Sequence, residues 1–258
     1  MILNALGEPV KIEKFVPHTV ITPGSEVITY PEKSYFYNGF TVTPVPQSIL
    51  DEAYQRGYES GLADAKPYAR ELEYIQSSGT QYIDTGFIPK HNTRVKMDFK
   101  SDGVPSSYSA GCAGLFGIRH GTSSNAFGIW FNDSEIYPHY GNVGYNANGL
   151  ISLSTKQRLI YELNARVLNV YSNTTSTKTC NSATFSCSYN MLLLSISTAG
   201  TVDERKAIGK LYSCQIYDNG TLVRDLIPVL TYSGEACLYD KVGERFYYNQ
   251  GTGSFTYS

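Results

Sequence analysis

The chain has 258 residues with 41% hydrophobic and 17% charged side chains, 22 tyrosines, one tryptophan and a formal net charge of −2. No run of lysine and arginine provides the cationic patch that nucleic-acid binding needs, and no apolar run approaches the roughly 18 residues of a membrane-spanning helix. We therefore expect neither nucleic acid nor a membrane among its partners. The first residues lack the basic start and apolar core of a secretory signal, so we expect synthesis in the cytoplasm without a signal peptide.

Residues 1–46 are rich in proline, threonine, valine and tyrosine, and six prolines divide them into short extended pieces. In YFYNGFTV, Tyr35 and Tyr37 share one parity, as in a short strand. We expect a small extended N-terminal module over this range.

Residues 47–70 contain the one short helix that we expect in the chain. Ser48 can cap its N-terminus and Pro67 ends it. A helix of about 18 residues is marginal in water by itself, so we expect it to use a partner, although a solvated spacer helix is an open alternative. The residues expected to serve oligomerisation or docking form a stripe at helical spacing: Leu50, Tyr54, Gly57 and Gly61.

From residue 71 to residue 258 the helical period disappears, and short strand-like runs alternate with turn signals such as Asn219-Gly220. About 188 residues of this kind are enough for two sheets and the core between them. We therefore expect a mainly β protein whose residues 71–258 form an antiparallel β-sandwich.

The five cysteines include no Cys-x-x-Cys pair. Cys214 and Cys237 lie in apolar runs, where small buried side chains are expected. Cys180 and Cys187 bracket a short segment and would pair only under oxidising conditions. The four histidines are scattered without metal-ligand spacing, so the pattern predicts no metal site.

Several stretches of the sandwich segment carry a family resemblance. They are LEYIQSSGTQYIDTGFIP (72–89), the strings FGIR and FGIW, IGKLYSCQIYDNGTLVRDLIPV (208–229) and LYDKVGERFYYNQGTGSF (238–255). This set resembles the concanavalin A-like, LamG-type lectin and glucanase domains of phage structural genes and gut-bacterial surface genes. The resemblance implies a jelly roll and no cofactor other than weakly bound Ca²⁺, for which Asp84 or Asp133 would be a donor.

The N-terminal zone carries a second resemblance. ITPGSEVITYPEKSYFYNGFTVTPVP is similar to a short module repeated in phage tail and fibre proteins, and AYQRGYESGLADA is similar to the small-residue helices that often follow it. The resemblance implies a virion protein that contacts other virion proteins through residues 1–70 and forms a homo-oligomer, with a trimer as one candidate.

The chemistry of the glucanases in this class needs three carboxylates on one sheet face. The nearest string is Asp133-Ser134-Glu135, which supplies two carboxylates within an expected turn and no third one. No Gly-x-Ser-x-Gly elbow or phosphate loop occurs either. We expect no enzymatic activity, and glycoside hydrolysis is the least favoured alternative.

The strands around the single tryptophan form the candidate binding site. Alternation directs Phe127, Ile129 and Phe131 toward the core. A sugar site needs an aromatic ring for the C–H face of the sugar and amide or guanidinium groups for its hydroxyls. The predicted carbohydrate-binding set has the opposite parity or follows the next turn: Arg119, Trp130, Asn132, Tyr137 and His139.

These patterns predict a phage virion protein whose lectin-like domain attaches to host-surface or environmental glycans. The alternative is a head-decoration or assembly protein without sugar binding, because tyrosine-rich surfaces also suit contacts between proteins. A tryptophan in a sandwich is often buried. If Trp130 is buried, the predicted sugar site loses its stacking platform and the structural alternative is favoured.

Overall fold

The computed structural model describes residues 35–37, 40–42, 66–121, 124–141, 148–182 and 184–258. The chain divides into two compact units, Met1–Ala65 and Lys66–Ser258. In the first unit, β1 (Tyr35–Tyr37) pairs antiparallel with β2 (Phe40–Val42). The helical stripe expected to dock or oligomerise, Leu50, Tyr54, Gly57 and Gly61, lies outside the described residues.

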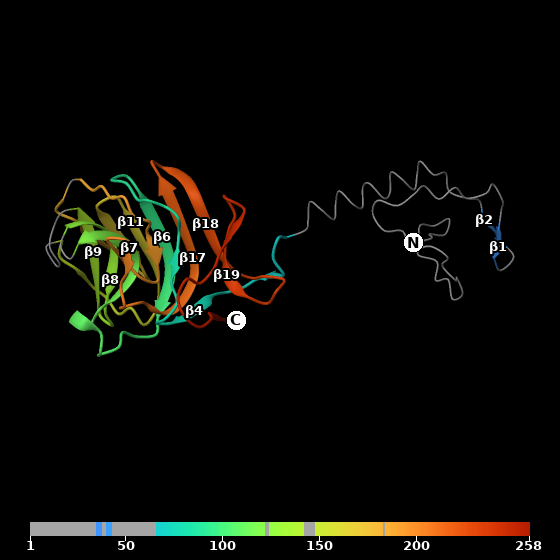
Figure 1. Cartoon of the computed structure of the whole chain (residues 1–258), viewed down its shortest axis with the longest axis horizontal. Coiled ribbons are helices and arrows are strands. Elements are labelled where there is room, and N and C mark those ends of the chain that lie inside the picture. The colour runs from blue at the N-terminus through green and yellow to red at the C-terminus, as the bar shows by residue number, and fades with distance from the viewer. Residues whose placement is uncertain (1–34, 38–39, 43–65, 122–123, 142–147, 183) are drawn as a thin grey trace. The chain divides into compact units, whose positions relative to one another are not determined.

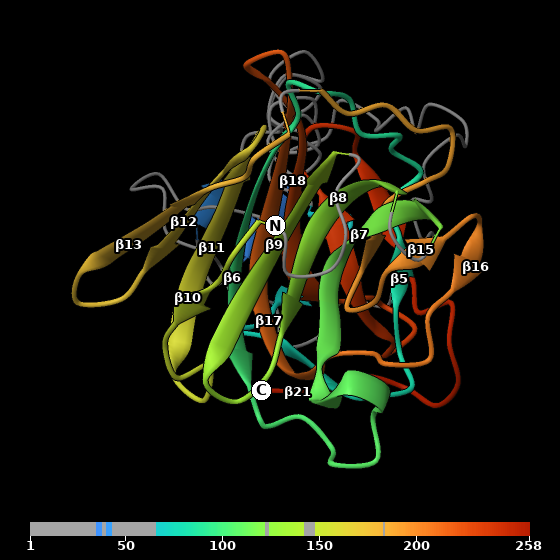
Figure 2. The same cartoon turned by 90° about the vertical axis from the view of Figure 1, so that its left-hand side faces the viewer.

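The second unit consists of two stacked sheets (Figure 1). Figure 2 shows β7, β8 and β9 in one layer and β6, β17 and β18 in the other. The smaller, eight-stranded sheet contains β5 (Ile83–Asp84), β7 (Ala113–Gly121), β8 (Ser124–Phe131), β9 (Glu135–Gly141), β10 (Ile151–Ser152), β14 (Leu192–Leu193), β15 (Ser197–Thr198) and β16 (Thr201–Val202). Its main path runs in the order β10-β9-β8-β7-β14-β5.

The larger sheet has eleven strands, with a main path in the order β13-β12-β11-β6-β17-β18-β19-β20. These are β6 (Arg94–Ser101), β11 (Arg158–Asn164), β12 (Val167–Tyr171), β13 (Thr175–Thr179), β17 (Ile208–Asp218), β18 (Thr221–Leu230), β19 (Ala236–Asp240) and β20 (Arg245–Tyr247), joined at the side by β3 (Arg70–Glu71), β4 (Ile75–Ser78) and β21 (Thr256–Tyr257). A short 3₁₀ turn, η1 (Ser109–Gly111), precedes β7. All strand pairs are antiparallel except that β15 runs parallel to β7. The antiparallel β-sandwich predicted from the sequence is therefore confirmed.

The core between the sheets follows from the alternation of side chains along each strand. In β6, every second residue is buried, so Val95, Met97 and Phe99 point inward while the charged residues between them remain partly exposed. The large buried rings that join the two layers are Phe99, Phe116, Phe127, Phe131, Tyr140 and Tyr161. The core thus uses one face of each sheet and leaves the other face for other interactions.

The sandwich begins earlier than the boundary at residue 71 that the sequence suggested. The backbone N–H of Ala69 donates to Leu230 O at 2.9 Å, and β3 pairs with the end of β18. The Tyr68 ring packs at 5.2 Å from Tyr239 on the outer face of the larger sheet. Residues 66–70 therefore belong to the sandwich, because their hydrogen bonds and ring contacts are made with β18 and β19.

The hairpin between β17 and β18 has the turn that its sequence demands. Asn219 and Gly220 both have positive φ, at 49° and 80°, as a two-residue hairpin turn requires. The described cysteines are all free, and Cys214 and Cys237 are buried as expected. None of the described segments is a helix long and apolar enough to cross a membrane.

Two glycines allow β7 and β8 to approach closely at the centre of the smaller sheet. Gly117 lies directly opposite Gly128. A Cβ added to Gly128 would collide with the carbonyl oxygen of Phe116 and lie 2.7 Å from the Gly117 Cα. These are backbone atoms, which cannot move aside as a flexible side chain can.

We therefore expect Gly128→Ala to lower the free energy of unfolding by about 3 kcal/mol, because the added methyl group overpacks the strand pair. Gly220→Ala is the matched control, since Gly220 has positive φ but no atom within 4 Å of an added Cβ, and it should cost only about 1 kcal/mol. Chemical denaturation of both variants measures the difference. Equal losses would show that the close approach of β7 and β8 is not a constraint.

Candidate functional site

The five residues predicted to bind carbohydrate come together on the outer face of the smaller sheet. Trp130 lies between Gly114 of β7 and Tyr137 of β9, and His139 lies opposite Gly128. Phe127, Ile129 and Phe131 point into the core, while Trp130 belongs to a separate cluster on the opposite face. The parity predicted from the sequence is therefore confirmed, since the inward and outward sets are the expected ones.

Trp130 is buried, so the predicted sugar site loses the stacking platform that it needs. Its side chain is only 1% exposed and packs against Cys112 and Ile196. The Arg205 guanidinium lies 4.2 Å from the ring centroid and that of Arg119 lies 5.1 Å from it. The ring is covered by cations and apolar side chains, so it offers no open platform on which a sugar can stack.

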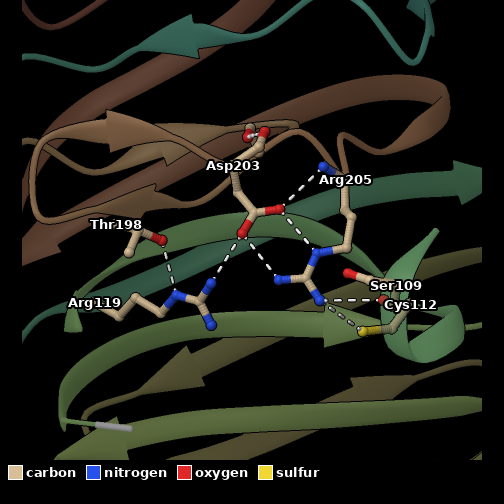
Figure 3. Close-up of polar contacts among 7 residues, drawn as sticks. Ser109, Cys112, Arg119, Thr198, Asp203 and Arg205 are labelled. Carbon is tan, nitrogen blue, oxygen red and sulfur yellow. Dashed lines mark hydrogen bonds and ion pairs between the residues drawn. The ribbon is translucent and has the colours of Figure 1, made fainter. Parts of the chain in front are cut away.

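The two arginines are held over the ring by Asp203 (Figure 3). Arg119 donates to Asp203 at 2.9 Å and to the Thr198 hydroxyl at 2.8 Å. Arg205 binds both Asp203 oxygens at 2.9 Å, and it also donates to the Ser109 carbonyl at 3.2 Å. The network therefore fastens β7, η1 and the segment around β15 and β16 to one another.

The charges of this network favour the ionised carboxylate. Burial by itself would raise the pKa of Asp203, but the hydrogen bonds from Arg205 and the positive charges of Arg205 and Arg119 outweigh it and lower the pKa. The side chains of the three residues are 10–16% exposed. Two cations and one anion are thus largely withdrawn from water, which makes their mutual pairing a condition of stability.

His139 lies beneath the same network and is 7% exposed, so it does not border an open surface as the sequence suggested. Its ring centroid lies 6.3 Å from that of Trp130. Burial, and then the positive charges of Arg119 and Arg205, lower the pKa of His139 to about 4. The imidazole is neutral near pH 7 because a further positive charge here would be both desolvated and repelled.

Asn132 and Tyr137 form a hydrogen-bonded group with Glu135 at the end of β8. Asn132 Nδ2 donates to Glu135 at 2.9 Å and to the Tyr137 hydroxyl at 3.1 Å, and the Tyr137 hydroxyl donates to Glu135. Burial and the contact with Glu135 raise the pKa of Tyr137 to about 12. Asn132 also lines a shallow pocket of about 220 Å³ with Val104, Pro105, Ser106, Gly111, Asp133 and Ser134. Asn132 is therefore the member of the predicted set that reaches a hollow on the surface.

The two carboxylates of the Asp133-Ser134-Glu135 string do not have the environment of a catalytic acid. The Lys156 ammonium, 2.6 Å away, lowers the pKa of Asp133, and the hydrogen bond from Tyr137 lowers the pKa of Glu135. A glycosidase general acid needs the opposite shift, toward a raised pKa. The arrangement around these two residues therefore does not favour glycoside hydrolysis.

The two candidate calcium donors are engaged by protein groups. Asp133 accepts from Lys156 and from the Val104 N–H, while Asp84 accepts from the Gly86 N–H and from Asn190. Among the described residues, no three side chains of histidine, cysteine, aspartate or glutamate lie close enough together to hold a metal ion. The described surface therefore provides no set of protein carboxylates that fits Ca²⁺.

A second surface, which the sequence reasoning missed, covers the outer face of the larger sheet over β6, β11 and β17. We call it the β6–β17 face. Its centre is a hollow of about 250 Å³ lined by Lys96, Asp98, Ile160, Ser213 and Gln215. Partly exposed tyrosines lie beside it on β17, where a β-bulge turns both Tyr212 and Ser213 outward.

Arginine side chains immobilise the tyrosines of the β6–β17 face. The Arg158 guanidinium lies 3.7 Å from the Tyr212 ring centroid. It also donates two hydrogen bonds to the Asp98 carboxylate, at 2.9 and 2.8 Å. The Arg94 guanidinium lies 3.8 Å from the Tyr217 ring. These contacts fix rings and planar polar groups around the hollow before any ligand binds.

The sequence contains a signal for this surface. The run RVKMDFKS alternates between charged and apolar residues, so Arg94, Lys96, Asp98 and Lys100 share the outward parity of β6. The two strands that flank β6 lie far from it in the sequence: Glu162 of β11 and Gln215 of β17 both pair with Lys96. The outward charges of β6 could therefore be predicted from the sequence, but the position of the tyrosines beside them could not.

Comparisons with known proteins add a distant similarity of fold. No protein-family model and no curated protein matches the sequence. A solved structure described as the Ruminococcus gnavus IT-sialidase CBM40 is 13% identical, with a TM-score of 0.39, over 57% of this chain and 91% of that one. A mutant NanB sialidase from Streptococcus pneumoniae is 13% identical with a TM-score of 0.37, over 61% of this chain, which spans only 27% of that protein. At these values the likeness carries no argument about function.

The Arg119–Asp203–Arg205 network leads to a stability prediction. Asp203→Asn leaves two poorly exposed guanidinium groups without their counterion, so we expect it to lower the free energy of unfolding by about 3 kcal/mol. The control is Asp218→Asn, which removes an ion pair with the 61%-exposed Lys90 and should cost less than about 1 kcal/mol. Chemical denaturation measures both values, and similar small losses would show that the network does not fasten the fold.

The lowered pKa of His139 predicts how stability depends on pH. The unfolded chain binds a proton on this residue near pH 6.5, whereas the folded chain resists it until about pH 4. The contribution is therefore fully present above pH 6.5 and is lost as the pH falls from 6.5 to 4, by up to about 3 kcal/mol. His139→Gln should flatten this part of the stability curve in denaturation experiments at a series of pH values. An unchanged slope would contradict the prediction.

Proposed function

We propose that residues 66–258 form a non-catalytic glycan-binding module whose saccharide site is the β6–β17 face. The observation that carries the proposal is the hollow of about 250 Å³ at the centre of this face. Hydroxyl, amide and charged groups converge there beside tyrosine rings, which is the combination that binds the polar and the C–H surfaces of a sugar.

The polar groups of the hollow are held in place but retain hydrogen-bonding capacity. Gln215 donates to Asp225 at 3.1 Å and accepts from the Tyr217 hydroxyl at 3.1 Å, so its amide has a fixed orientation. An amide carries two N–H donors and an oxygen with two lone pairs, so a donor and an acceptor position are left for a ligand. A site organised in advance loses less conformational entropy when the ligand binds.

We further propose that the chain is a phage virion protein and that it attaches to host-surface or environmental glycans. It is supported by the resemblance of ITPGSEVITYPEKSYFYNGFTVTPVP to phage tail and fibre modules. On this proposal residues 1–70 contact other virion proteins, and the chain acts as a homo-oligomer. Several copies on one particle would convert weak single sites into strong attachment.

The second candidate function is a head-decoration or assembly protein of the virion without sugar binding. The burial of Trp130 under Arg119 and Arg205 favours it, because the aromatic platform predicted from the sequence is not accessible. Electron microscopy of the particle distinguishes a tail from a head location.

A glycan array probed with the full chain tests the proposed site. We expect Tyr212→Ala and Gln215→Ala each to weaken the binding of any recognised glycan roughly tenfold, because each removes a group that lines or borders the hollow. Tyr232→Ala is the control, since this 75%-exposed side chain lies on the turn after β18, and it should leave binding unchanged.

The unfolding midpoint of each variant is measured alongside, so that a loss of binding is separated from a loss of fold. Binding that survives in both variants would place the glycan elsewhere. No binding to any glycan by the parent chain would contradict the proposed function and leave the assembly function as the better account.

A further inference from the structure

The β6–β17 face has an unbalanced charge. The side chains that alternate with core residues along β6, β11 and β17 include five cations, Arg94, Lys96, Lys100, Arg158 and Lys210, and two carboxylates, Asp98 and Glu162. The whole chain, in contrast, has a net charge of −2. Cations therefore outnumber carboxylates among the outward side chains of these three strands.

Three of these cations form a row across neighbouring strands. Lys100 of β6 lies directly opposite Arg158 of β11 on one side and Lys210 of β17 on the other. Like charges in such cross-strand positions repel each other and destabilise a sheet. Arg158 is neutralised by Asp98 and the Lys210 ammonium lies 4.1 Å from the Tyr74 ring, but Lys100 forms no hydrogen bond or ion pair with any residue that the structure describes.

Lys96, which lines the hollow, resembles Lys100 in its lack of an ion-pair partner among the described residues. Its ammonium also forms no hydrogen bond or ion pair within the described part of the chain, although Glu162 lies opposite it on β11. Four other lysines, in contrast, lie within 2.9 Å of a carboxylate oxygen: Lys66, Lys90, Lys156 and Lys241. The carboxylate between Lys96 and Lys100, that of Asp98, is occupied by the two hydrogen bonds from Arg158.

From this arrangement we infer that the ligand of the β6–β17 face is an anionic saccharide, whose carboxylate or phosphate groups are bound by Lys96 and by Lys100. The inference rests on the proposed function of the same face and specifies the class of its ligand. The two lysines lie four positions apart on one strand, so their Cα atoms are about 13 Å apart, and neighbouring acidic sugar residues of an oligosaccharide can each contact one ammonium group. An anion bound there also relieves the repulsion in the row of cations.

The proposed binding mode gives the sugar ring a defined position on the β6–β17 face. Its hydroxyl groups face Ser213 and Gln215 in the hollow, while its acidic group faces Lys96. Lys100 is in reach of the acidic group of the next sugar residue. Tyr212, on the bulge beside Ser213, borders the ring. The neutral groups thus provide affinity for any sugar, and the lysines provide the preference for an acidic one.

Pairs of saccharides that differ only in charge test the inference with the full chain. The probes are oligogalacturonate against its methyl ester, mannose 6-phosphate against mannose, and further acid and neutral pairs on an array. We expect the acidic member of a recognised pair to bind roughly tenfold more tightly at low salt, and the difference to shrink as salt screens the charges. The double variant Lys96→Gln, Lys100→Gln should bind both members with the affinity of the neutral one.

Lys178→Gln is the matched control, because Lys178 lies on β13 away from the hollow and is also without an ion pair among the described residues. Its preference for the acidic member should equal that of the parent chain. Equal binding of both members by the parent chain overturns the anionic class but leaves the glycan-binding function intact. Failure to bind any member of any pair overturns both. A preference for carboxylated or for phosphorylated probes identifies the source of the negative charge.

Discussion

The alternation of side chains along each β-strand is the constraint on which the rest of this structure depends. Because two sheets share a single core, every strand must direct half of its side chains inward, and the hydrophobic residues of β6, β8 and β11 occupy those positions. The other half is released from packing between the sheets. The two outer faces can therefore carry aromatic and charged residues without disturbing the core.

The same chemistry has opposite consequences on the two outer faces because burial differs. On the smaller sheet, Arg205 lies over Trp130 with 16% and 1% exposure, and Asp203 balances one of the two positive charges over the ring. On the larger sheet, Arg158 lies over Tyr212 but is 51% exposed. A buried cation and ring mainly stabilise the fold, whereas an exposed pair leaves polar atoms that a ligand can reach.

The alternation of side chains along the strands, with a period of two residues, made much of the fold predictable from the sequence. Strand runs, the Asn219-Gly220 turn and the inward parity of Phe127, Ile129 and Phe131 follow from local sequence, and the structure has all three. The burial of Trp130 did not follow, because Asp203 and Arg205 reach it from about seventy positions later in the chain. Parity decides the face on which a residue lies, but only the long-range connection decides whether something covers it. No local pattern in FGIWFN contains that information.

The Arg119–Asp203–Arg205 network gives the outward Trp130 a structural role. In the segment around β15 and β16, only the two-residue strand β15 pairs with β7, while Ala199 and Arg205 each share one further backbone hydrogen bond with it. Trp130 provides a flat surface under both guanidinium groups, and Asp203 joins them from that segment. The tryptophan thus adds a side-chain attachment to the few backbone hydrogen bonds of this edge, which is a structural role for the residue that first suggested a sugar site. On the outer face of the larger sheet, in contrast, Lys96 and Lys100 form no such ion pair within the part of the chain that the structure describes.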